Sequence, residues 1–227
     1  MKKNIPNAIT CCNLLSGCVA VSQAFAGDME MAFLFIIIGA LFDFCDGLVA
    51  RLLHVSSPIG KELDSLADCV TFGVAPSAMV FGTLQMLTEN EYLPYIAFIM
   101  AAFSALRLAK FNLDERQTTS FIGLPTPANA LFWASLIVGY QDEIIASLSF
   151  AKFIIIIMVL ICSYILIAEI PMFSLKFKHY GWKGNEIRYI FLLTSLVLII
   201  IFFEKALAIA IAWYVLLSVI SNAFSKK

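Results

Sequence analysis

Residues 153–168 read FIIIIMVLICSYILIA, an almost unbroken run of apolar side chains. A strand of a membrane barrel would alternate between apolar and polar residues, and this run does not alternate. With its flanking residues it is long enough for a helix to cross about 30 Å of hydrocarbon. The run therefore predicts a transmembrane helix, and the fold class we expect is an all-α, polytopic transmembrane helical bundle.

The rest of the chain has the same character. Of its 227 residues, 61% are hydrophobic and only 14% are charged, which lies outside the usual composition of a soluble globular domain. We expect a single integral membrane domain, 1-227, with about eight spans, and six or seven stay possible because residues 204–205 form either a turn or an interruption. The expected spans cover residues 8–26, 31–53, 60–87, 92–111, 123–140, 150–173, 188–203 and 206–222.

The basic residues predict the orientation of these spans. With the N-terminus in the cytoplasm, 13 of the 15 Lys and Arg residues lie on the cytoplasmic side, as the positive-inside rule requires. They are Lys2, Lys3, Arg51, Lys61, Arg107, Lys110, Arg116, Lys176, Lys178, Lys183, Arg188, Lys226 and Lys227. We expect the chain to be integral to the inner (cytoplasmic) cell membrane, with its active site facing the cytoplasm. No nucleic acid partner is expected, because the basic residues gather at membrane edges.

The most informative stretch is residues 43–68, DFCDGLVARLLHVSSPIGKELDSLAD. Asp43 and Asp46 share one helix face, and Asp64 and Asp68 share another. An ionised carboxylate inside a bilayer costs about 2.5 kcal/mol or more unless it is paired, solvated or bound to metal. The loop 54–59 would let the two helices pack antiparallel with their acidic faces opposed, so that the carboxylates converge.

Carboxylates without His or Cys favour hard cations, so a divalent metal, Mg2+ or Mn2+, is expected. Two ions about 3.5 to 4 Å apart would suit a displacement at phosphorus. Small residues at positions 47, 50 and 60 leave room for a bulky polar group, and Arg51 is placed to clamp a diphosphate. An ion-coupled transporter is the alternative from another class, but it predicts a second, inverted copy of the motif, which the sequence lacks.

The spacing Asp-x2-Asp-Gly-x2-Ala-Arg, followed after eight residues by Gly-x3-Asp-x3-Asp, resembles at every fixed position the motif of the CDP-alcohol phosphotransferases. The resemblance implies transfer of a phosphatidyl or related group from a CDP-linked donor to an alcohol, with release of CMP. It implies that the metal ligands are Asp43, Asp46, Asp64 and Asp68, and that Asp68 is also the general base. The matching nucleotide and diphosphate positions are Asp46, Gly47, Ala50, Arg51 and Gly60.

Outside the motif, the chain resembles the branch of this family that joins CDP-diacylglycerol to L-serine and so makes phosphatidylserine. Three segments carry this resemblance: PNAITCCN at 6–13, LDSLAD leading into FGVAP at 63–76, and RLAKFN at 107–112 followed by FIGLPTPA at 121–128. The resemblance implies CDP-diacylglycerol, L-serine and membrane lipids as partners, and a homodimer.

Two groups of polar residues outside the motif are further candidates. Arg107 and Lys110 lie one turn apart and would bind the serine carboxylate or a lipid phosphate, with positive-inside anchoring as the alternative. Asn7, Thr10 and Asn13 share a helix face and would either contact the nucleotide or bond across helices. Glycerol 3-phosphate or an inositol phosphate stays open as the acceptor, although a dianionic phosphate should require more basic groups than these two.

Overall fold

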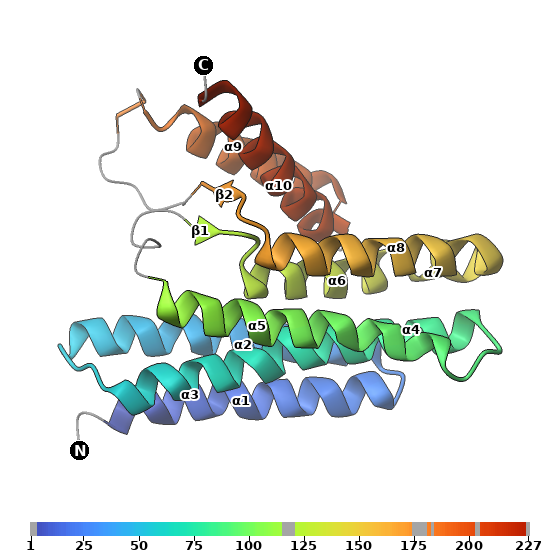
Figure 1. The fold of residues 1–227 in the computed structure, drawn as a ribbon, viewed down its shortest axis with the longest axis horizontal. Helices are drawn as coiled ribbons and strands as arrows, with labels where there is room; N and C mark the ends of the chain where they lie inside the picture. The colour runs from blue at the N-terminus through green and yellow to red at the C-terminus, as the bar shows by residue number, and fades with distance from the viewer. Residues whose placement is uncertain (1–3, 115–120, 174–180, 183, 203–204, 226–227) are drawn as a thin grey trace.

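The computed structural model describes residues 4–114, 121–173, 181–182, 184–202 and 205–225. In this part of the chain the structure is helical apart from two short strands (Figure 1). The helices are α1 (Asn4–Phe25), α2 (Met29–Leu52), α3 (Pro58–Asp68), the π-helix η1 (Cys69–Val74), α4 (Ala75–Leu87), the 3-10 helix η2 (Leu93–Phe98), α5 (Ile99–Leu113), α6 (Thr126–Gly139), α7 (Gln141–Ala146), α8 (Leu148–Ile167), α9 (Glu186–Phe202) and α10 (Ala206–Ser225). The strands β1 (Phe121–Ile122) and β2 (Pro171–Met172) pair antiparallel. The predicted helical bundle is confirmed.

Every predicted span contains a helix, but the helices differ in length. Within the described residues, 5 helical segments are long and apolar enough to cross a membrane, so the protein is an integral membrane protein. They are Asn4–Phe25, Met29–Leu52, Pro58–Leu87, Leu93–Leu113 and Phe150–Ile167. Helix α6 has 14 residues and α9 has 17, which is shorter than the roughly 20 that a perpendicular span needs.

Two predicted boundaries are wrong. The fifth span was expected from Gly123, but that residue forms a turn with φ of 75°, and α6 begins only at Thr126. A Cβ at Gly123 would lie 2.5 Å from the carbonyl oxygen of Leu166, so only glycine fits this turn. The sixth span was expected to reach Phe173, but α8 ends at Ile167 and β2 follows. Apolar composition overextended the sixth span, because the residues of β2 are apolar as well.

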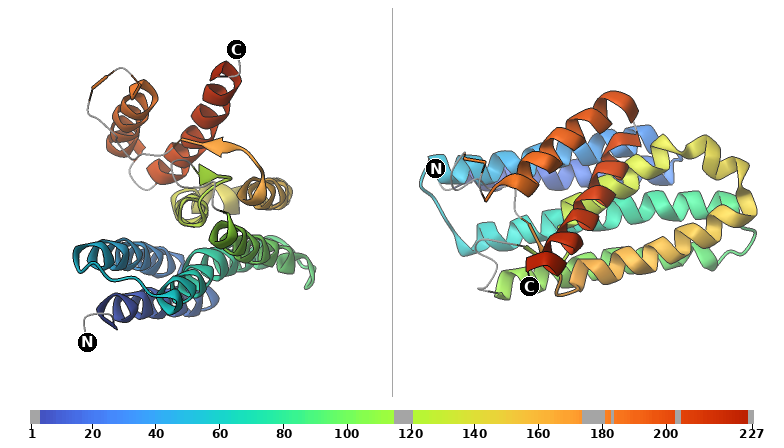
Figure 2. Two further views of the ribbon diagram at one scale, coloured as in Figure 1. Left: turned by 60° about the vertical axis from the view of Figure 1, so that its left-hand side comes forward. Right: turned by 90° about the horizontal axis from the view of Figure 1, so that it is seen from above.

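The ends of the helices sort into two groups. In Figure 1 the start of α1, the α2–α3 connection, the end of α5 and the strand pair lie at one end of the molecule. The α1–α2 turn, the α4–η2 turn and α7 lie at the opposite end. Figure 2 shows α6 and α8 lying between α1 to α5 on one side and α9 with α10 on the other.

This sorting agrees with the predicted charge asymmetry where it can be followed. Arg51, Lys61, Arg107 and Lys110 belong to the first group of ends, whereas the Lys205 amine donates a hydrogen bond to Glu143 of α7 at the opposite end. Several of the basic residues assigned to the cytoplasmic side lie outside the described residues. These are Lys2, Lys3, Arg116, Lys176, Lys178, Lys183, Lys226 and Lys227.

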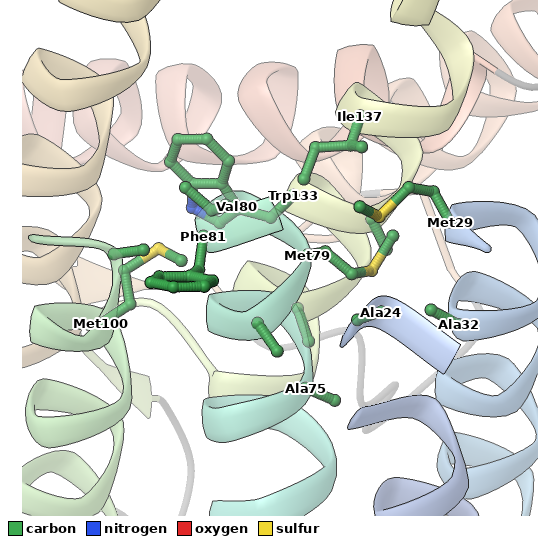
Figure 3. Packing of buried hydrophobic residues seen from close by; sticks show 14 of the residues in the cluster. Ala24, Met29, Ala32, Ala75, Met79, Val80, Phe81, Met100, Trp133 and Ile137 are labelled. Carbon is green, nitrogen blue, oxygen red and sulfur yellow. The ribbon is translucent and has the colours of Figure 1, made fainter. Parts of the chain in front are cut away.

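The apolar core is built around α4. Met79 and Val80 of α4 are fully buried against Ala24 of α1, Ala32 of α2 and Trp133 of α6 (Figure 3). Alanines at the contacts let the helices approach closely, which matters in a membrane because packing rather than the hydrophobic effect drives helix association there. The core thus holds α1, α2 and α4 in fixed positions and leaves their polar ends to form a site.

Candidate active site

A sharp reversal of the chain places the two aspartate pairs near each other. Helix α2 ends just before His54, which adopts φ of 51° in the left-handed region that closes helix C-termini. Helix α3 begins at Pro58, and its N-cap Ser57 accepts a hydrogen bond from the Gly60 amide at 3.0 Å. The ends of both helices are therefore fixed by the short connection between them.

Three of the four predicted carboxylates come together, and Asp46 is not part of this group. Asp43, Asp64 and Asp68 each offer an oxygen atom, and these atoms all lie within 4.8 Å of one another. Direct contact between α2 and α3 is sparse, because α1 packs extensively against α2 and also against α3. The acidic faces of α2 and α3 are opposed as expected, but the two helices pack mainly against α1 rather than against each other.

Helix α1 also supplies hydrogen bonds to the two buried aspartates. The Thr10 hydroxyl donates to Oδ2 of Asp46 at 2.5 Å, and the Asn13 amide donates to Oδ1 of Asp68 at 3.1 Å. Asp46 is 7% exposed and Asp68 is 8% exposed. Of the two interpretations of this polar face, bonding across helices is thus the one observed for Thr10 and Asn13, while Asn7 lies beside Gly60.

The π-helix η1 continues directly from Asp68 and fixes Asn13 from the other side. The hydroxyl of Thr71 in η1 donates to the backbone oxygen of Asn13 at 3.1 Å. A Cβ at Gly17 would lie 2.3 Å from that hydroxyl, and one at Gly39 would lie 2.5 Å from the Thr71 methyl group. The close approach of α1, α2 and η1 therefore depends on glycine. Such π-helical turns occur frequently at functional sites.

A cavity of about 270 Å³ opens beside Asp46 and Asp64. A Cβ at Gly47 would meet nothing within 4 Å, whereas one at Gly60 would lie 2.9 Å from the Ser57 hydroxyl. The cavity is lined by Pro6, Asn7, Thr10, Asp46, Gly47, Ala50, Val55, Ser56, Ser57, Gly60, Lys61 and Asp64. Most positions assigned to the nucleotide from the motif thus face one shared space.

Two basic residues are placed differently from the expectation. Arg51 is exposed and does not line the cavity, so its role as a diphosphate clamp stays a prediction. Lys61, which was expected only as one of the basic residues on the cytoplasmic side, does line the cavity. The available signal was its position one turn before Asp64, on the same helix face.

Arg107 and Lys110 point in different directions. Arg107 is 7% exposed, and its guanidinium carbon lies 5.1 Å from the centre of the Phe111 ring. Its Nε atom is buried and has no hydrogen-bond partner in the described structure, and the side chain interacts electrostatically with Asp68. Lys110 is exposed. Only Arg107 is thus directed towards the aspartate cluster.

The cluster is suited to a divalent cation. Its ligand atoms are all carboxylate oxygens, the donor type that hard cations prefer. Oδ1 of Asp64 is buried without a hydrogen-bond partner among the described residues, as expected for an atom whose natural partner is an ion. Carboxylates this close together cannot all stay ionised without a cation between them. Asp43, Asp64 and Asp68 therefore form a group that can hold metal.

Comparison with known proteins agrees with this geometry. The family model described as CDP-alcohol phosphatidyltransferase matches residues 3–165. A CDP-diacylglycerol–serine O-phosphatidyltransferase of Bacillus subtilis (strain 168) is 37% identical over 146 residues, covering 63% of this chain and 80% of the relative.

More distant relatives have the same name. The enzyme from Methanocaldococcus jannaschii is 35% identical over 136 residues, 60% of this chain and 59% of the relative. The enzyme from Mycobacterium leprae (strain TN) is 33% identical over 134 residues, 56% of this chain and 44% of the relative. The matched part thus spans about half the length of these two relatives.

Proposed function

The chain belongs to the CDP-alcohol phosphatidyltransferase family, and we propose that it transfers the phosphatidyl group from CDP-diacylglycerol to the hydroxyl of L-serine, giving phosphatidylserine and CMP. The observation that carries this proposal is the cavity beside the aspartate cluster, because the residues of the family motif line it. The serine specificity is supported by the names of the relatives.

The donor binds in the cavity with its nucleotide towards the small residues Gly47, Ala50 and Gly60. A Cβ at Gly47 would meet nothing, so the open space there is available to the cytidine. The diphosphate lies towards Asp46 and Asp64, while the acyl chains stay in the bilayer. The site faces the cytoplasm of the inner membrane, because the described basic residues on α2, α3 and α5 gather at this end.

Four residues would hold divalent metal: Asp43, Asp46, Asp64 and Asp68. The proposed ions are two Mg²⁺ or Mn²⁺, and when bound they would neutralise the diphosphate and stabilise the charge of departing CMP. The protein's part is to hold the carboxylates in place. The Thr10 hydroxyl does this for Asp46 and the Asn13 amide does it for Asp68.

Asp68 is the proposed general base. The Asn13 amide holds Oδ1 of this carboxylate, which leaves Oδ2 to accept the proton of the serine hydroxyl. The serine oxygen then bonds to the phosphorus that carries diacylglycerol. The bond from that phosphorus to the CMP oxygen breaks, and CMP leaves with the electron pair.

Arg107 is the proposed partner of the serine carboxylate. A buried donor without a partner costs about 1–3 kcal/mol, and the planar guanidinium suits a carboxylate. Arg107 is also the only buried Lys or Arg in the described part of the chain, which favours a singly charged acceptor group over the dianionic phosphate of glycerol 3-phosphate. Lys110, exposed at the same helix end, is better placed for lipid phosphates of the membrane surface.

The proposal also includes a homodimer and a single membrane domain over residues 1–227. Light scattering of the detergent-solubilised protein, after subtraction of the detergent, should give twice the mass of one 25.1 kDa chain. A monomer at concentrations where the protein is active would remove the dimer from the proposal.

The reaction is tested by measuring CMP release from CDP-diacylglycerol by purified protein with Mg²⁺ or Mn²⁺ and a panel of alcohols. We expect release with L-serine and loss of release on chelation of the metal. Release with glycerol 3-phosphate or an inositol phosphate instead of serine would assign another acceptor. No release with any alcohol would remove the enzymatic function.

A further inference from the structure

The cavity beside the aspartates has an uneven charge. Its lining contains two carboxylates, Asp46 and Asp64, and a single cationic side chain, Lys61. A diphosphate that enters this space brings further negative charge towards the carboxylates. Cations between the carboxylates and the diphosphate offset part of this repulsion, but the outer phosphate oxygens require donors from the protein.

Lys61 is positioned to provide such a donor. It lies one turn before Asp64 on α3, next to Gly60, whose small size keeps this wall of the cavity open. Its amine donates one hydrogen bond to the backbone oxygen of Asn112 at 2.8 Å. An ammonium group has three donors, so this bond leaves the amine further donors for a phosphate.

A small network keeps Lys61 in this position. The Asn112 amide donates to the Ser65 hydroxyl at 2.8 Å, and that hydroxyl donates to the backbone oxygen of Lys61 at 3.3 Å. Helix α3 is thus bound to the C-terminal end of α5, where a cation is also favoured by the helix dipole. Lys61 and Arg51, the basic residue of the family motif, are both exposed, but of the two Lys61 alone lines the cavity.

We infer that Lys61 binds the diphosphate of the CDP-linked donor. The inference rests on the proposed function, because it deepens the donor site of that reaction. Lys61 contacts the phosphate oxygens from α3, one helical turn before Asp64. Its contribution therefore depends on the number of phosphates in the ligand and does not extend to the cytidine.

The test is the binding of three soluble probes to the full-length protein in detergent with Mn²⁺, measured by calorimetry. Lys61→Gln should weaken CDP binding about 10- to 150-fold, since a hydrogen bond to a charged group contributes about 1.5–3 kcal/mol. CMP binding should weaken less, and cytidine binding should not change. Lys61→Arg, which keeps the charge, should bind CDP within about threefold of the wild type.

Two further variants separate this role from a structural one. Ser65→Ala removes the hydrogen bond from Asn112 but keeps the Lys61 amine and its own bond to the Asn112 backbone oxygen, so it should weaken CDP binding much less than Lys61→Gln does. Lys152→Gln removes a charge from α8, near the opposite end of the molecule, and should bind CDP normally. Loss of CDP binding in Ser65→Ala equal to that in Lys61→Gln would overturn the inference, because the α3–α5 contact alone would then explain the effect.

Equal losses for CDP, CMP and cytidine, or unchanged CDP binding in Lys61→Gln, would also overturn it. Failure of the proposed function can be distinguished from failure of the Lys61 inference. In that case the wild-type protein itself would show no serine-dependent release of CMP. A wild type that is active with serine, together with a Lys61→Gln protein that binds CDP normally, would reject the role of Lys61 and keep the function.

Discussion

The two sides of the aspartate cluster differ in how completely the protein satisfies its own polar groups. On the side of α1 and α3 there is an open cavity. Beside it Thr10 bonds to Asp46 and Lys61 bonds to Asn112, and Oδ1 of Asp64 is the lining atom that is buried without a partner among the described residues. On the side of α5 and α6, five buried residues have polar atoms without partners among the described residues. These are Ser104, Arg107, Thr126, Asn129 and Trp133.

This difference indicates that the two substrate sites are prepared in different ways. A nucleotide needs volume, and the donor side provides it with small residues and fixed helix ends. A small polar acceptor needs hydrogen-bonding groups, and the α5 and α6 side has such groups that the chain itself leaves unsatisfied. Because each costs about 1–3 kcal/mol when unpaired, we interpret them as groups that the acceptor or its water molecules complete.

The largest expected effect lies at the residue shared by both sides. Asp68→Asn should lower the rate of CMP release at saturating substrates by about 10³-fold, because the amide cannot take the serine proton. The Asn13 bond can persist, so the protein should remain folded by circular dichroism. Asp28→Asn at the opposite end of α2 is a suitable control, since asparagine also caps a helix. An Asp68→Asn protein within tenfold of wild-type activity would contradict the assignment.

The second largest effect is expected on the acceptor side of the aspartate cluster. Arg107→Met should raise the KM for serine about 30- to 100-fold, through loss of a charged hydrogen bond of about 2–3 kcal/mol, and leave the KM for CDP-diacylglycerol nearly unchanged. Lys110→Gln should raise the serine KM by less than about threefold, because an exposed charge contributes little. Steady-state kinetics with each substrate varied in turn measures both constants. Equal increases of the serine KM in the two variants would show that the burial of Arg107 does not matter for serine binding.

A substitution in the wall of the cavity tests the donor side. Gly60→Ala places a methyl group 2.9 Å from the Ser57 hydroxyl and 3.0 Å from Oδ1 of Asn7, so the start of α3 must shift. We expect the KM for CDP-diacylglycerol to rise about tenfold and the melting temperature to fall, as overpacking costs about 1–3 kcal/mol. Gly47→Ala meets nothing and should not lower the melting temperature. A lower melting temperature for Gly47→Ala than for Gly60→Ala would contradict this description of the cavity.

The smallest effect is expected far from both sides. Lys205 donates a hydrogen bond to Glu143 and thereby lowers the pKa of that carboxyl. Any stability from the lowered pKa is present above the unfolded-state pKa and is lost as the pH falls through the folded-state pKa. Both groups are solvent-accessible, so Lys205→Gln should change the melting temperature at pH 7 by less than about 1 °C and leave activity unchanged. A large loss of activity would show that this end of the molecule contributes to the reaction.

Much of the site follows from sequence because its signals are local. The apolar blocks predict the helices, and the spacing of Asp43, Asp46, Asp64 and Asp68 places each pair on one helix face. The motif positions Gly47, Ala50 and Gly60 do line one cavity.

Features that depend on tertiary approach were not predictable in this way. The π-helix forms where Thr71 packs against Gly17 and Gly39, which come from two other helices. Whether Arg51 or Lys61 faces the cavity depends on where α1 lies against α2 and α3. The pairing of β1 with β2 joins segments separated by almost fifty residues of chain, so no local pattern indicates it.

The central claim is that the carboxylates of α2 and α3 form a cation site that holds the donor diphosphate. Mn²⁺ binding to the purified protein, followed by electron paramagnetic resonance with and without CDP, tests it most directly. We expect wild-type protein to bind Mn²⁺, CDP to tighten this binding as linkage requires, and Asp64→Asn to lose both effects. Mn²⁺ binding that is unaffected by CDP and unchanged in Asp64→Asn would contradict the account.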